Sequence, residues 1–168
     1  MISATFTGLI ITHFEGVLSD AGKLGVLLTA SLPMLMDTGG NCGAQASTLV
    51  IRGLALGEVE FGDIFRVWWR EVRVGLLVGV VLTLVNVGRQ LALYYFTSGV
   101  SPDTVKVTMI VSMAMFCTII IAKSIGCTLP LLAKKLRLDP ALMASPIITT
   151  LVDACSLTIL FSIATLAM

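Results

Sequence analysis

Five apolar segments occupy most of this chain, at residues 1–19, 24–50, 72–96, 104–132 and 141–167. Of its 168 residues, 57% are hydrophobic and 12% are charged, whereas an ordinary soluble domain carries about a quarter charged residues. A single domain of this size cannot bury so much apolar surface within itself, so lipid must be part of its surroundings. We therefore expect an all-α, multi-pass membrane protein with five transmembrane helices, in one domain that covers residues 1–168.

The same features exclude several classes of function. The net charge of +1, without a basic stripe, argues against binding to nucleic acid. The sequence lacks a G-x-S-x-G motif, an H-E-x-x-H motif and a phosphate-binding loop, so we expect no enzyme. The four cysteines have no metal-ligand spacing, and we interpret them as small buried apolar residues (Cys42, Cys117, Cys127 and Cys155).

Basic residues are divided unevenly between the two ends of the expected helices. One side of the membrane receives three, Lys23, Arg89 and Lys106. The other side receives eight: Arg52, Arg66, Arg70, Arg73, Lys123, Lys134, Lys135 and Arg137. Because cytoplasmic ends carry the excess of Lys and Arg, the N-terminus is expected in the cytoplasm and the C-terminus outside the cell membrane. Within the polar connection 52–71, Trp68 and Trp69 are expected to anchor the chain at the interface.

The second apolar segment carries a polar stripe. Its length corresponds to about 40 Å of helix, more than the ~30 Å hydrocarbon core, so one end should project or the helix should break near its glycines. Asp37, Asn41, Gln45 and Thr48 are spaced by 4, 4 and 3 residues and thus share one helix face. Close packing alone explains Gly40 and its neighbouring glycines. Amides and a carboxylate at this depth need water or protein partners, which favours a pore-lining role.

Asp153 is the residue that points most directly to a function. It lies about 12 residues, or about 18 Å, into the last apolar segment, near the expected bilayer midplane, and no Lys or Arg in that segment neutralises it. Pro146, Thr149, Thr150 and Asp153 share a helix face, and Ser145 adds another hydroxyl. Such an oxygen-rich stripe suits a hard cation, although a hydrogen-bonded seam between helices is the alternative interpretation.

Two long motifs resemble the membrane domain of the MgtE-type magnesium channels. The run PMLMDTGGNCGAQASTLVIRGLALGE, from Pro33 to Glu58, is similar to the second helix of that family. The run GCTLPLLAKKLRLDPALMASPIITTLVD, from Gly126 to Asp153, is similar to its fourth and fifth helices. The resemblance extends over essentially the whole chain. Family members usually add a cytosolic N-terminal region with regulatory magnesium sites, and this sequence is expected to comprise the membrane domain alone.

The resemblance implies a homodimer in the lipid bilayer whose pore follows the two-fold axis. Asp153 and its mate would form the central Mg²⁺ site, with a contribution from the Thr149 carbonyl. Gly39, Gly40, Asn41, Pro146 and Ser145 match positions close to the pore. Because Mg²⁺ dehydrates reluctantly, a wide site with few carboxylates suits it. The candidate metal-site residues are therefore Asp37, Gly40, Asn41, Ser145, Thr149, Thr150 and Asp153.

Three functions remain open from the sequence. The first is a divalent-cation channel or transporter that is selective for Mg²⁺ and has an aspartate filter; the passage of other divalent cations stays open. The second is a proton-coupled cation transporter in which Asp153 or Asp37 alternates between proton and metal. The third is a membrane subunit that transports nothing.

Overall fold

The computed structural model describes residues 2–14, 16, 19, 22–97, 99–143 and 146–167. These residues form five α-helices and two short 3-10 helices, with no strand among them. The α-helices are α1 (Ile2–His13), α3 (Lys23–Ala55), α4 (Ile64–Thr97), α5 (Pro102–Lys135) and α6 (Pro146–Ala167). The 3-10 helices are η1 (Phe61–Asp63) and η2 (Pro140–Met143). The prediction of an all-α protein is confirmed.

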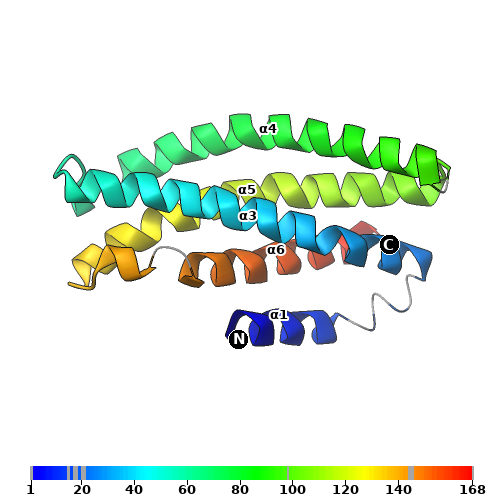
Figure 1. Ribbon diagram of the computed structural model, residues 1–168, viewed down its shortest axis with the longest axis horizontal. Coiled ribbons are helices and arrows are strands. Elements are labelled where there is room, and N and C mark those ends of the chain that lie inside the picture. The colour runs from blue at the N-terminus through cyan, green and yellow to red at the C-terminus, as the bar shows by residue number, and fades with distance from the viewer. Residues whose placement is uncertain are drawn as a thin grey trace.

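The four long helices lie side by side in an elongated bundle, and α1 lies along α6 (Figure 1). Helix α5 is central, because it contacts α3, α4 and α6. Helix α3 also contacts α6, so that α3, α5 and α6 form a three-helix unit. Helix α4 packs against α5 on the outside of this unit. The core of this unit contains fully buried side chains from three helices, among them Leu35, Val111, Ile119 and Phe161.

Three helical stretches within the described residues are long and apolar enough to cross a membrane, at 61–97, 102–135 and 146–167. Helix α3 has 33 residues and is about 50 Å long, but its polar centre lowers its hydropathy. Helix α1 has 12 residues, about 18 Å, which is shorter than the ~30 Å hydrocarbon core. The chain is thus a multi-pass membrane protein, and the presence of five membrane-crossing helices stays a prediction.

The helix boundaries differ from the expected ones in three places. Helix α3 runs without a break through Gly39, Gly40 and Gly43, so the alternative of a helix broken near its glycines is wrong. The helix extends beyond the expected apolar segment instead, from Lys23 to Ala55. Helix α4 begins at Ile64, which places most of the expected connection 52–71 in helix. The last apolar segment is not one helix from residue 141, because the 3-10 helix η2 covers its first residues. Helix α6 begins only at Pro146, and proline is well suited to the first helical position.

The turn between α4 and α5 shows how local chemistry starts a helix. Gly99 has a φ of 79°, a backbone conformation that glycine adopts without strain. The Ser101 hydroxyl accepts a hydrogen bond from the Thr104 backbone N–H at 3.3 Å, and Pro102 follows at the first helical position. Asp103 lies in the first turn, where a carboxylate interacts favourably with the helix dipole. These features set the start of α5 at the outer end of the bundle.

A buried ion pair joins α4 to α5. Lys123 Nζ lies 3.4 Å from Glu71 Oε2, and the two side chains are only 5% and 3% exposed. Gly75 lies against the lysine stem, since a Cβ added there would be 3.4 Å from Lys123 Cγ, an ordinary van der Waals contact. Removal of one charge from such a pair leaves the other buried without a partner. The sequence analysis had counted Lys123 only as a basic residue at the cytoplasmic end and had not identified this pair.

We predict that Glu71→Gln lowers the free energy of unfolding by about 3–5 kcal/mol, because it leaves the Lys123 charge buried alone. The double variant Glu71→Gln, Lys123→Met should recover most of this loss, since neither charge remains to be desolvated. Thermal unfolding in detergent measures both effects, with Glu58→Gln as the exposed control. A double variant as unstable as Glu71→Gln alone would contradict this account.

Candidate functional site

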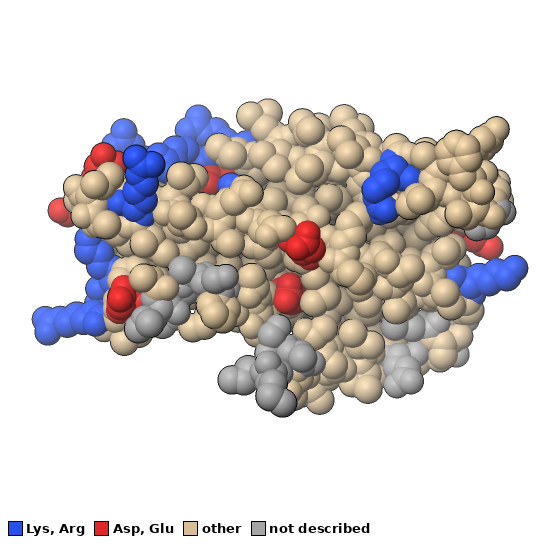
Figure 2. Space-filling model, in the orientation of Figure 1, with Lys and Arg blue, Asp and Glu red and all other residues tan. Residues whose placement is uncertain are grey.

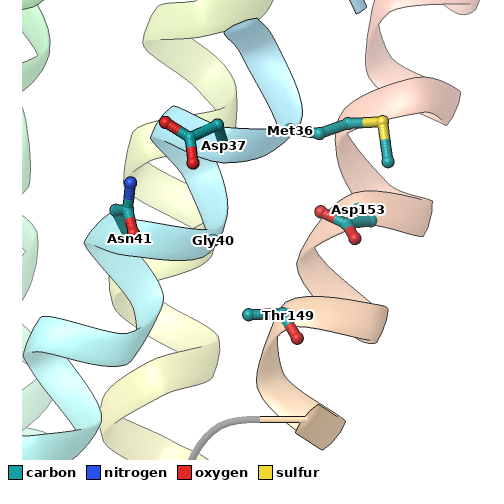
Figure 3. Close-up of a pocket in the computed structure, with 6 residues that line it drawn as sticks. All are labelled: Met36, Asp37, Gly40, Asn41, Thr149 and Asp153. Carbon is teal, nitrogen blue, oxygen red and sulfur yellow. The ribbon is translucent and has the colours of Figure 1, made fainter. Parts of the chain in front are cut away.

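A pocket of about 230 Å³ lies between α3 and α6. Four of its lining residues come from α3 and two from α6: Met36, Asp37, Gly40, Asn41, Thr149 and Asp153 (Figure 3). It thus brings together side chains that are more than 100 positions apart in the sequence. The contact between α3 and α6, which share the neighbour α5, brings Asp37 and Asp153 to the lining of one pocket.

Helix periodicity explains the α3 wall of the pocket. Asp37, Gly40 and Asn41 are three and four residues apart, so they lie along one face of α3. A Cβ at Gly40 would lie 3.4 Å from Thr149 Cγ2, an ordinary van der Waals contact, so Gly40 lies close to Thr149 where α3 and α6 meet. Asp37 and Asn41 are exposed in the isolated chain, although they lie in the central part of a long helix.

The α6 wall starts from a proline. Pro146 begins the helix, and its carbonyl oxygen accepts hydrogen bonds from the Thr149 hydroxyl at 3.2 Å and the Thr150 hydroxyl at 2.7 Å. Asp153 is half-buried and extends from α6 toward α3 (Figure 3). It lies seven residues, or about 11 Å, from the start of a 22-residue helix. Asp153 is therefore about a third of the way along α6, not at its centre as expected from the apolar segment.

The pocket contains most of the residues that the sequence analysis selected. Five of those seven line it: Asp37, Gly40, Asn41, Thr149 and Asp153. Thr150 is not among the lining residues, and its hydroxyl is held by the Pro146 carbonyl. Ser145 lies outside the described residues. Gln45 and Thr48 continue the polar stripe of α3 but do not line the pocket.

Other residues named from the sequence have packing roles. Gly39 is buried, and a Cβ there would come within 2.7 Å of Thr118 Cγ2 and 2.9 Å of Val152 Cγ1. Gly43 and Gly126 mark a direct backbone contact between α3 and α5, since a Cβ at Gly126 would overlap the Gly43 carbonyl. Of the cysteines, Cys42 and Cys127 are buried, but Cys117 and Cys155 are only half-buried.

The electrostatics of the pocket favour a cation. Two carboxylates and one amide line it, and no Lys or Arg does. On the face shown in Figure 2, acidic patches lie in the middle of a surface without other charge, while basic residues gather toward the ends. Among the described residues, no group of three or more His, Cys, Asp and Glu side chains could hold a metal ion. One chain thus offers too few ligands to replace the whole water shell of a divalent cation.

Met36 is the lining residue that the sequence analysis did not identify. It precedes Asp37 and lies four residues before Gly40, so helical spacing from a known site residue could have found it. Its thioether is a soft ligand that a hard cation does not prefer. We interpret Met36 as an adaptable apolar wall of the pocket.

Comparison with known proteins identifies the family. The family model for MgtE, described as a divalent cation transporter, matches residues 32–163. The chain is 33% identical over 166 residues to the magnesium transporter MgtE of Thermus thermophilus, an alignment that covers 99% of this chain and 34% of that protein. It is 35% identical over 159 residues to the magnesium transporter MgtE of Bacillus subtilis, covering 95% and 33%. The protein of the same name from Enterococcus faecalis is 31% identical over 172 residues, covering 100% and 35%.

The chain therefore spans about a third of the length of these relatives. All three are named as transporters and not as enzymes, in agreement with the expectation from the sequence. The matched residues include all six that line the pocket, from Met36 to Asp153. On this evidence the chain belongs to the MgtE family of divalent cation transporters.

Proposed function

We propose that this chain forms the ion-conducting part of a transporter that passes Mg²⁺ across the membrane. The observation that carries the proposal is the pocket between α3 and α6, where Asp37, Asn41 and Asp153 meet without a basic residue. A carboxylate at depth in a membrane helix is costly unless it faces water, protein or a cation. Relatives that are named magnesium transporters support Mg²⁺ as the cation.

The pocket has a volume of about 230 Å³ and is open to its surroundings, so a bound ion can keep water molecules there. Mg²⁺ loses its water reluctantly, so the ion is expected to pass with much of its shell, held through water by Asp153, Asp37 and the Asn41 amide. Thr149 would contribute oxygen atoms. Thr150 belongs to the proposed site through its place in the first turns of α6, and Ser145 only through its position in the sequence just before Pro146.

A second copy of the chain would complete the site. Asp37 and Asn41 are exposed in the isolated chain, and polar groups at this depth need water or protein beside them rather than lipid. A symmetric dimer whose α3 and α6 faces meet would bring two Asp153 carboxylates to a common axis. The pore of our proposal follows this axis, and the aspartates form its filter.

The proposed orientation places the N-terminus in the cytoplasm and the C-terminus outside. Lys123 is neutralised by Glu71, which leaves seven basic residues at the end where α3 and α5 finish and α4 begins. The opposite end has three. This difference still favours a cytoplasmic location for the more basic end.

Proton coupling is the alternative mechanism. Asp153 is half-buried and has no ion pair among the described residues, so a proton could take the place of the metal there. Under this alternative, one proton leaves the carboxylate each time a cation binds. The two mechanisms share the same site and differ in their dependence on a proton gradient.

We predict that Asp153→Asn and Asp153→Ala sharply reduce Mg²⁺ uptake into liposomes. In a dimer each substitution removes two charges, and a loss of about 3 kcal/mol in ion stabilisation weakens occupancy by about two orders of magnitude. Monovalent current should persist or rise, because the divalent ion no longer blocks the pore. Asp37→Asn should reduce uptake less, since Asp37 is more exposed.

The matched control is Asp103→Asn, which removes an exposed carboxylate at the outer end of α5, away from the pocket. Its uptake should equal that of the unmodified chain. Wild-type Mg²⁺ uptake by Asp153→Ala would leave Asp153 as a structural group and end the filter proposal.

The proton gradient separates the two mechanisms. For a channel, Mg²⁺ uptake into liposomes is expected to follow the Mg²⁺ gradient and the membrane potential, with the same initial rate whether or not a pH gradient is imposed. Uptake that accelerates with a proton gradient of suitable sign, together with measured counter-movement of protons, would favour the coupled transporter. Liposomes that contain the chain but take up no Mg²⁺ under any gradient would indicate the non-transporting subunit.

The dimer is tested by cross-linking. In a cysteine-free variant, Asn41→Cys is expected to form covalent dimers with a short bis-maleimide, because residue 41 would lie near its own mate on the two-fold axis. Leu77→Cys is the control, since Leu77 is 73% exposed on α4, away from the proposed axis. Equal cross-linking at both positions would indicate random collision of chains in the bilayer. A monomer that conducts Mg²⁺ would contradict the proposal that two chains share one pore.

A further inference from the structure

A second pocket lies at the more basic end of the bundle, away from the proposed ion path. It has a volume of about 500 Å³ and is formed where the segment after α3 meets the start of α4. Three arginines, two acidic residues and two valines line it: Arg66, Arg70, Arg73, Glu58, Asp63, Val59 and Val67. Figure 2 shows Lys and Arg gathered at this end of the molecule. The proposed transport of Mg²⁺ makes no use of this site.

The three arginines share one face of α4. Their spacing of four and three residues places Arg66, Arg70 and Arg73 in a row along the helix. Arg70 lies 3.6 Å from Glu71 Oε1, but Glu71 is already engaged by Lys123. Among the described residues, no ion pair connects the arginines to Glu58 or Asp63. Within the described part of the chain, Arg66 and Arg73 have no ion pair and are available to an external anion, and Arg70 can add the N–H donors that its contact with Glu71 leaves unused.

The depth of the pocket matches that of lipid headgroups. The apolar part of α4 starts at Val74, and the ~20 residues needed to cross the hydrocarbon core extend from there toward the other membrane surface. Arg66 to Arg73 then occupy the ~12 Å just outside the hydrocarbon. Trp69, 48% exposed, and Phe65, 72% exposed, lie on the same stretch, as aromatic residues at a membrane interface do.

We propose that this pocket binds the headgroup of an anionic glycerophospholipid. The guanidinium groups of Arg66, Arg70 and Arg73 hold the phosphodiester, which planar N–H donors match geometrically. The carboxylates of Glu58 and Asp63 accept hydrogen bonds from headgroup hydroxyls. Three positive and two negative side chains give the lining a net charge of +1, which favours an anion over a zwitterion. The exposed Phe65 and Trp69 lie at the same headgroup level, where aromatic side chains anchor a protein at the membrane interface.

The chain contains its own reporters for this proposal. Trp68 and Trp69 are its two tryptophans, and both lie between Arg66 and Arg70. Lipids with brominated acyl chains quench tryptophan fluorescence at short range. The experiment therefore compares quenching in phosphatidylcholine vesicles that contain either brominated phosphatidylglycerol or brominated phosphatidylcholine in equal amount.

We expect brominated phosphatidylglycerol to quench the unmodified chain more strongly. The double variant Arg66→Gln, Arg73→Gln should lower the relative binding constant of phosphatidylglycerol by about fivefold for each arginine removed. Arg66→Lys, Arg73→Lys keeps both charges but loses the paired N–H donors, so an intermediate preference is expected. The control Arg52→Gln, Lys134→Gln removes two exposed charges from the same end outside the pocket and should keep the preference.

Three results would overturn the proposal. Equal quenching of the unmodified chain by the two lipids would mean that the pocket does not select an anionic headgroup. Equal loss of preference in the control variant would mean that the whole basic end attracts the lipid without a defined site. Loss of the preference on addition of glycerol phosphate would identify a soluble phosphate as the occupant instead of a lipid.

Discussion

The contact of α3 with α5 and α6 is the constraint on which the candidate site depends. Gly43 and Gly126 allow the α3 and α5 backbones to touch, and Gly39 packs where a Cβ would overlap Thr118 and Val152. With α3 held in this way, Gly40 faces Thr149 across the open space that Asp37 and Asp153 share. Small residues permit such approach in membranes, where helices associate through packing and not through the hydrophobic effect.

Two kinds of polar residue in the apolar helices differ in their partners. Some between α4 and α5 pair with each other, as Glu71 does with Lys123 and Asn86 with Ser112 at 3.3 Å. Among the described residues, Asp37, Asn41 and Asp153 have no ion pair or side-chain partner of this kind, and all three line the pocket. The first group specifies how two helices pack. The second group stays available to solvent and ions, which is why it carries the proposed function.

Much of the candidate site was accessible to sequence reasoning, because a helix has a fixed period. Asp37 and Asn41 in one segment, and Thr149 and Asp153 in another, were each placed on a common face by spacing alone. The distance of Asp153 from the start of its helix was overestimated, because apolar content does not reveal that η2 and Pro146 delay the start of α6. The ion pair of Glu71 with Lys123 was missed because its partners are 52 positions apart.

The sequence by itself determined the helical class and the membrane environment, since both follow from long apolar runs and few charges. It also determined which residues share a helix face. Only the tertiary structure decided that α3 stays continuous, that α5 is the central helix, and that the Asp37 and Asp153 faces meet. The physical reason is that hydropathy and periodicity are local properties. Contact between helices depends on the shapes of two surfaces that are distant in the sequence, such as those around Gly43 and Gly126.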